Sequence, residues 1–114
     1  MESALVVSYT GKSTAFFTEM LNAACVNQIT TLSSVGEAQR SLLERDFDLV
    51  LVNAPLRDES GEKFSRYIAS KGTSQVILVV RSEHFDAVSA VCENDGVLVV
   101  SKPVNRAEQF FGPR

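Results

Sequence analysis

The chain has 114 residues, of which 45% are apolar and 22% charged, values that are ordinary for a single globular domain. Its net charge is −3 and its lysines and arginines are scattered, so no basic face predicts binding to a nucleic acid or an anionic membrane. Cys25 and Cys92 form no CxxC pair, which argues against a zinc or redox site. No apolar run is long enough to cross a membrane and no basic segment opens a signal peptide, so we expect a cytoplasmic protein.

Short β-branched runs alternate with segments of helical period along the chain. Strands are predicted at about residues 4–7, 28–32, 49–52, 76–80 and 97–100. Helices are predicted at about 14–24, 35–43, 62–70, 85–91 and 105–111, the second opened by a capping box from Ser34 to Glu37. This order predicts one α/β domain over residues 1–114, a doubly wound five-stranded parallel sheet with helices on both faces. The short last helix leaves open whether an output domain follows residue 114.

The segment from Asp48 to Gly61 joins an apolar strand, which ends at Asn53, to a loop closed by a glycine. Far downstream, Lys102-Pro103 follows the fifth strand. With these two segments at these positions, the chain resembles the receiver domain of response regulators, the CheY-like family with a flavodoxin-like fold, over about residues 4–111. In such sheets the functional site lies beyond the carboxyl ends of the strands.

Receivers of this family use two acids after the first strand to bind Mg²⁺, an aspartate after the third as phosphoryl acceptor, a hydroxyl after the fourth and a lysine-proline pair after the fifth. The matching residues here are Ser8 and Tyr9, Asn53, Val80, and Lys102 with Pro103. An amide cannot accept a phosphoryl group, and Mg²⁺ rarely binds through neutral ligands alone. The resemblance therefore implies a degenerate pocket with no metal, no cofactor and no catalytic residue.

Two further expectations concern charged groups near this pocket. Lys102 is expected to donate a hydrogen bond to the Asn53 side-chain oxygen or to a nearby carbonyl, because a buried charge without a partner is costly. Asp58 and Glu59 are interpreted as solvated acids of the loop that follows Asn53.

The leading functional hypothesis is a non-catalytic pseudo-receiver that dimerises or binds a protein partner in signal transduction. Its expected surface is the family's output face, formed by the fourth helix, the fifth strand and the fifth helix. The candidate contacts there are Phe85, Val88, Val99, Phe110 and Phe111. The segment 53–59 is also similar to degenerate receivers that precede an ANTAR antitermination domain. Such a domain would lie beyond Arg114, so RNA or DNA would be bound only there.

Two alternatives stay open at this point. One is a phosphorylatable receiver with a surrogate acceptor, Ser8 or Asp58. The other is a nucleotide site at Gly11-Lys12-Ser13, which lies where a P-loop would begin a helix. The full P-loop signature needs a glycine five positions before Gly11, and that position is Val6. The simpler interpretation is a turn glycine followed by a helix whose N-cap is Ser13 or Thr14.

Overall fold

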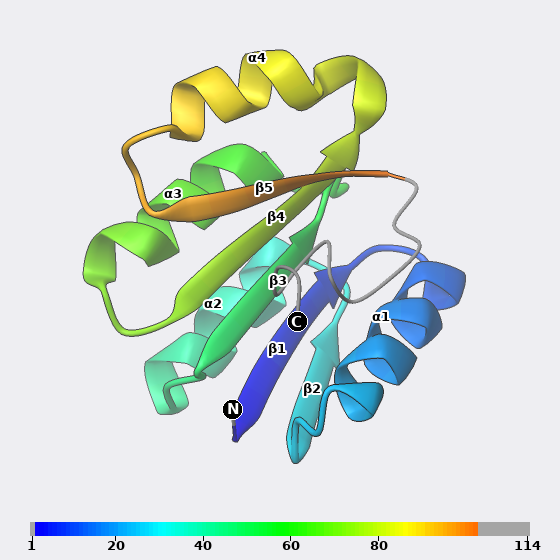
Figure 1. Ribbon diagram of the computed structural model, residues 1–114. Helices are drawn as coiled ribbons and strands as arrows, with labels where there is room; N and C mark the ends of the chain where they lie inside the picture. Colours follow the sequence, from blue (N-terminus) through cyan, green and yellow to red (C-terminus); the bar gives the residue numbers. More distant parts are fainter. Residues whose placement is uncertain (1, 103–114) are drawn as a thin grey trace.

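The computed structural model describes residues 2–102, and Met1 and residues 103–114 lie outside the described part. Within it the elements run β1 (Ser3–Ser8), α1 (Gly11–Ala23), β2 (Gln28–Leu32), α2 (Val35–Glu44), β3 (Leu49–Asn53), α3 (Gly61–Lys71), β4 (Gln75–Arg81), α4 (Ser82–Cys92) and β5 (Val97–Lys102). All neighbouring strands are parallel, in the order β2-β1-β3-β4-β5 (Figure 1). The predicted doubly wound parallel sheet is confirmed, and the helix predicted at 105–111 lies outside the described residues.

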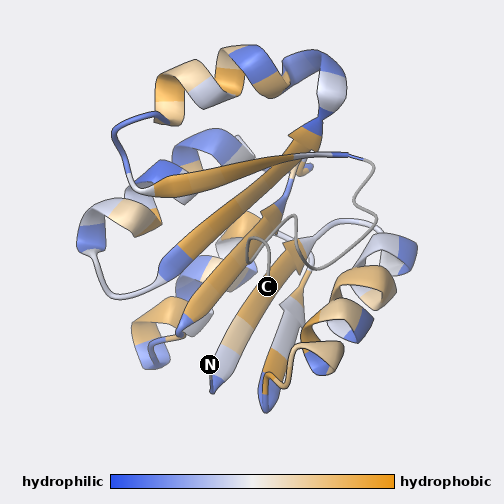
Figure 2. Ribbon diagram, viewed as in Figure 1, coloured by the Kyte–Doolittle hydropathy of each residue, from blue (hydrophilic) through white to orange (hydrophobic). Residues whose placement is uncertain are grey.

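The sheet lies between helices on both of its faces. Strands β1 and β3 are buried along their whole length, as central parallel strands must be when helices cover both sides. Phe17 and Leu21 of α1 pack on one face, and Ala38, Phe64 and Cys92 bring α2, α3 and α4 onto the other. Figure 2 shows β3, β4 and β5 as the most apolar elements, whereas the edge strand β2 is largely white. Because side chains alternate between the faces of a strand, these two cores share every central strand.

Helix α1 begins three residues earlier than the sequence suggested. Its N-cap is Thr10, whose hydroxyl oxygen accepts a hydrogen bond from the Ser13 amide at 3.3 Å. The expected N-cap at Ser13 or Thr14 is therefore wrong, because the threonine ahead of Gly11 supplies the capping oxygen first. Only Tyr9 and Thr10 connect β1 to α1. A connection of two residues is too short to wrap the phosphates of a nucleotide as a P-loop does.

The loop between β3 and α3 is closed by a close approach at Gly61, the first residue of α3. A Cβ atom placed there would lie 3.2 Å from Ala54 Cβ and from Val52 Cγ1. The glycine lets the start of α3 sit directly against the end of β3. This contact fixes the loop on which the residues after Asn53 are carried.

None of the helices within residues 2–102 is long and apolar enough to cross a membrane.

Candidate functional site

Four strands end at one edge of the sheet and bring together three residues that the sequence singled out, Ser8, Asn53 and Lys102, with a fourth, Arg81. Ser8 ends β1, Asn53 ends β3, Arg81 ends β4 and Lys102 ends β5. Ser8 is the register partner of Asn53, and Arg81 is the register partner of Lys102. This carboxyl edge is where ligands bind in open parallel sheets.

Asn53 is buried, and only one end of its amide has a partner. Its Nδ2 donates to Ser8 Oγ at 3.0 Å, and the two side chains are 6% and 2% exposed. Asn53 Oδ1 is buried without any hydrogen-bond partner. A buried acceptor that has lost water and gained no donor is unfavourable and calls for a physical explanation.

Lys102 reaches the loop after β3 rather than the amide of Asn53. Its Nζ donates to the carbonyl oxygen of Ala54 at 2.7 Å, which is the nearby-carbonyl arrangement among the two that we expected. Burial, together with the positive charge of Arg81, holds the pKa of the Lys102 ammonium below its ordinary value. The ammonium has three N–H groups, and this bond uses one of them.

Val80 lies on the opposite face of the sheet from the Asn53 side chain and lines a smaller cavity beside Ala54 and Pro55. Val80 packs in the core under α2, α3 and α4, whereas its neighbour Val79 belongs to the core on the α1 face. Asn53 is in register with Val79, so its side chain points to the α1 face and the next strand residue on that face is Arg81. Arg81, which the sequence analysis did not single out, is the β4 residue that lines the larger cavity with Asn53.

Tyr9 and Asp58 are not simply pocket-lining residues, because each of them contacts another part of the chain. Tyr9 is 45% exposed, with the guanidinium of Arg57 4.8 Å from its ring centroid. Asp58 is not merely a solvated loop acid, because its carboxylate accepts from the backbone amides of Val35 at 3.1 Å and Gly36 at 3.0 Å. Those two bonds hold the pKa of Asp58 below its ordinary value. The acid that follows it, Glu59, is exposed as expected.

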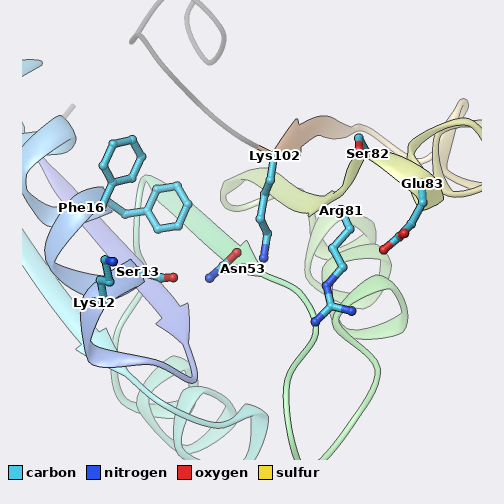
Figure 3. Close-up of a pocket in the computed structure, with 9 residues that line it drawn as sticks. Lys12, Ser13, Phe16, Asn53, Arg81, Ser82, Glu83 and Lys102 are labelled. Carbon is cyan, nitrogen blue, oxygen red and sulfur yellow. The ribbon is translucent and has the colours of Figure 1, made fainter.

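An open cavity of about 630 Å³ lies between the start of α1 and the ends of β4 and β5. Figure 3 shows the side chains that surround it. Its lining residues include Lys12, Phe16, Asn53, Arg81, Glu83 and Lys102. Three of them are cationic and one is acidic, in a chain whose net charge is −3.

The donor set at this edge does not suit Mg²⁺, the metal that the receiver fold implies. The metal prefers carboxylate oxygens, and the residues at the expected positions are the neutral Ser8, Tyr9 and Asn53. The cavity beside them is lined by cations. Within residues 2–102, no group of three or more His, Cys, Asp or Glu side chains could hold a metal ion.

The predicted partner-binding residues in the described part lie against the core. Phe85, Val88 and Val99 are partly buried and pack on the core formed with α2, α3 and α4. The exposed apolar residues of this region are instead Val91 of α4, at 47%, and Leu98 of β5, at 46%. Sequence periodicity could not separate these two from core positions. Pro103, Phe110 and Phe111 lie outside the described residues.

The architecture is that of the CheY-like receiver domains of response regulators. A signal receiver domain of an HD domain-containing protein from Pseudomonas fluorescens matches with a TM-score of 0.81 at 19% identity, over 96% of this chain and 82% of that one. A CheY-like receiver domain from Methylobacillus flagellatus matches with a TM-score of 0.76 at 23% identity, over 94% and 91%.

A putative response regulator from Chloroflexus aurantiacus gives a TM-score of 0.81 at 13% identity, over 96% of this chain and 92% of that one. No protein-family model matches the sequence, and no curated protein matches it either. Identities this low establish the shared fold and leave the function to be argued from the site.

Proposed function

We propose that this chain is a non-catalytic pseudo-receiver of a two-component-type response regulator, which acts as a dimerisation or protein-interaction module in signal transduction or transcription control. The observation that carries the proposal is the buried Asn53 amide at the end of β3, bonded to Ser8. An amide at this point offers no nucleophilic oxygen for phosphoryl transfer. The neighbouring cations repel the metal ion that would have to neutralise an incoming phosphoryl group.

The geometry does not favour either surrogate acceptor. Ser8 is 2% exposed and its hydroxyl oxygen already accepts the Asn53 amide. Asp58 is exposed, but both of its carboxylate oxygens are engaged by the first amides of α2. Neither residue lines the cationic cavity.

The proposed partner is a second copy of this chain or another protein, bound through the region of α4 and β5. In the described part its exposed apolar side chains are Val91 of α4 and, on the other face of the edge strand β5, Leu98, so the interface would wrap around this free edge of the sheet. We expect Phe110→Ala to weaken self-association more than it lowers the melting temperature. In the antitermination form of this role, a domain beyond residue 114 would bind the RNA.

The deciding experiment is intact mass spectrometry of the chain after incubation with acetyl phosphate, with and without Mg²⁺. We expect no added phosphoryl group in either sample. A metal-dependent gain of one phosphoryl group would show that the pocket is active and would end the proposal. Sedimentation velocity over a range of concentrations, without phosphodonor, then measures self-association, which should not depend on metal or phosphodonor.

A further inference from the structure

The cavity at the carboxyl edge is lined by three cations and one acid, Glu83, so positive charge is in excess there. Lys12, Arg81 and Lys102 form no ion pair within residues 2–102. No acidic side chain lies in the first turn of α1, so the positive end of that helix dipole faces the cavity uncompensated. Like charges held together at the edge of a sheet repel each other, and an anion placed among them removes that repulsion.

The unpartnered oxygen of Asn53 is the second, independent feature. The Asn53 side chain is 6% exposed and lines the cavity (Figure 3), and its Oδ1 is buried just beneath that wall without a partner. Since Nδ2 is held by Ser8, the oxygen end is the free end of the amide. A ligand that donates an N–H or O–H to it would satisfy a buried acceptor that the folded chain leaves unmet.

The remaining wall is apolar. Phe16 is 41% exposed and stands edge-on to Phe17, with ring centroids 5.3 Å apart. A volume of about 630 Å³ lies in the range of small-molecule sites and exceeds the needs of a single inorganic ion. An organic body can therefore lie against the rings while a charged group reaches the cations.

We propose that this cavity binds a small organic acid, without metal and without covalent transfer. Its anionic group lies among Lys12, Arg81 and Lys102, and an adjacent N–H or O–H donates to Asn53 Oδ1. The inference rests on the proposed non-catalytic function, because the bound acid takes the place of a transferred phosphoryl group as the signal at this site.

The test is an NMR titration of the ¹⁵N-labelled 114-residue chain in EDTA, with hydroxyacetate and acetate as matched probes. Hydroxyacetate carries a donor beside its carboxylate and acetate does not. We expect saturable shifts of the Asn53 side-chain amide and of the backbone amides at Lys12, Arg81 and Lys102. The dissociation constant should be on the order of millimolar for hydroxyacetate and about fivefold weaker for acetate.

Matched variants separate a built site from general attraction to cations. Lys12→Gln and Arg81→Gln should each weaken hydroxyacetate binding, the latter about tenfold. Their controls are Lys63→Gln and Arg40→Gln, which remove exposed cations from α3 and α2 and should leave binding unchanged. Shifts that do not saturate, or that all four variants reduce equally, overturn the proposal.

The NMR titration tests the organic-acid site, and the acetyl phosphate experiment tests the non-catalytic function, so one proposal can fail without the other. Phosphoryl uptake would remove the non-catalytic function whatever the titration shows. An absence of uptake together with an absence of saturable binding would leave the interaction module standing and remove only the organic-acid site.

Discussion

The ammonium of Lys102 bonds to the carbonyl oxygen of Ala54, at 2.7 Å, while the side-chain oxygen of the preceding residue, Asn53, stays without a partner. The lysine thus ties the end of β5 to the loop after β3. This contact is made by a backbone group and does not depend on the identity of residue 53. Under the proposed function, this contact gives the lysine a structural role that needs no phosphoryl group.

Replacing Asn53 by aspartate should not restore phosphorylation. The single carboxylate would stand beside Lys102 and Arg81, and Ser8 and Tyr9 would still supply no acid for Mg²⁺. The measurement is intact mass of Asn53→Asp after acetyl phosphate and Mg²⁺, where we expect the mass of the unmodified variant. Labelling of this variant would contradict the metal argument.

The same variant should lose the organic-acid site. A carboxylate at position 53 neutralises part of the local positive charge and repels the anion, so hydroxyacetate should bind Asn53→Asp at least about tenfold more weakly. The NMR titration described above measures this. Unchanged affinity would show that the anion does not approach residue 53.

Asp58→Asn should destabilise the chain by about 1 kcal/mol or less, because an exposed carboxylate that caps the first amides of α2 is replaced by a weaker acceptor. Folding lowers the pKa of Asp58, so its contribution to stability is complete above the unfolded-state pKa and is lost as pH falls through the folded-state pKa. Urea unfolding at pH 7 and at pH 3 measures the effect, which should shrink at the lower pH.

The control for Asp58 is Glu59→Gln, which removes the next acid of the same exposed loop. Its side chain makes no hydrogen bond or ion pair within residues 2–102. It should leave stability at pH 7 nearly unchanged. Equal losses from both variants would mean that loop charge in general, rather than the contact with α2, stabilises the fold.

Arg81→Gln should raise the pKa of Lys102, since burial and the charge of Arg81 both lower it and the substitution removes the second cause. For a lysine whose folded-state pKa is lowered, the unfolded chain binds more protons between the two pKa values, so stability rises with pH in that window. Arg81→Gln should make this rise smaller. Lysine Cε resonances followed against pH measure the pKa, with Arg40→Gln as the control that should not move it.

Leu98→Ser and Val91→Ser should weaken self-association, each by about fivefold to tenfold, because both remove exposed apolar surface from the proposed interface. Leu43→Ser is the matched control: its side chain is 85% exposed on α2, away from α4 and β5. Sedimentation velocity measures the dimer fraction. If Leu43→Ser weakens the dimer as much as the other two, the interface lies elsewhere.

The alternation of apolar runs predicted the order of the strands and helices, because hydrophobic periodicity and turn-forming residues are local properties of a sequence. The site was predicted only in part. Asn53, Ser8 and Lys102 could be placed at strand ends, but Arg81 was missed because the strand runs one residue past its apolar core. The role of Asp58 was also missed, since its partners Val35 and Gly36 lie 23 and 22 residues earlier in the chain. Likewise, the exposure of Leu98 depends on which helix covers β5, a tertiary property that periodicity does not contain.

The register pairing of Ser8 with Asn53 bears on how such a pocket can evolve. Each of the two side chains is the hydrogen-bond partner of the other. A metal-dependent acceptor would need an acid at Asn53 and further acids at Ser8 and Tyr9, and none of these changes alone creates a Mg²⁺ site. Under the proposed function, recovery of phosphoryl chemistry would therefore need several substitutions together. We therefore expect substitutions that change the response of the protein to fall at its binding surfaces, and not to restore phosphorylation.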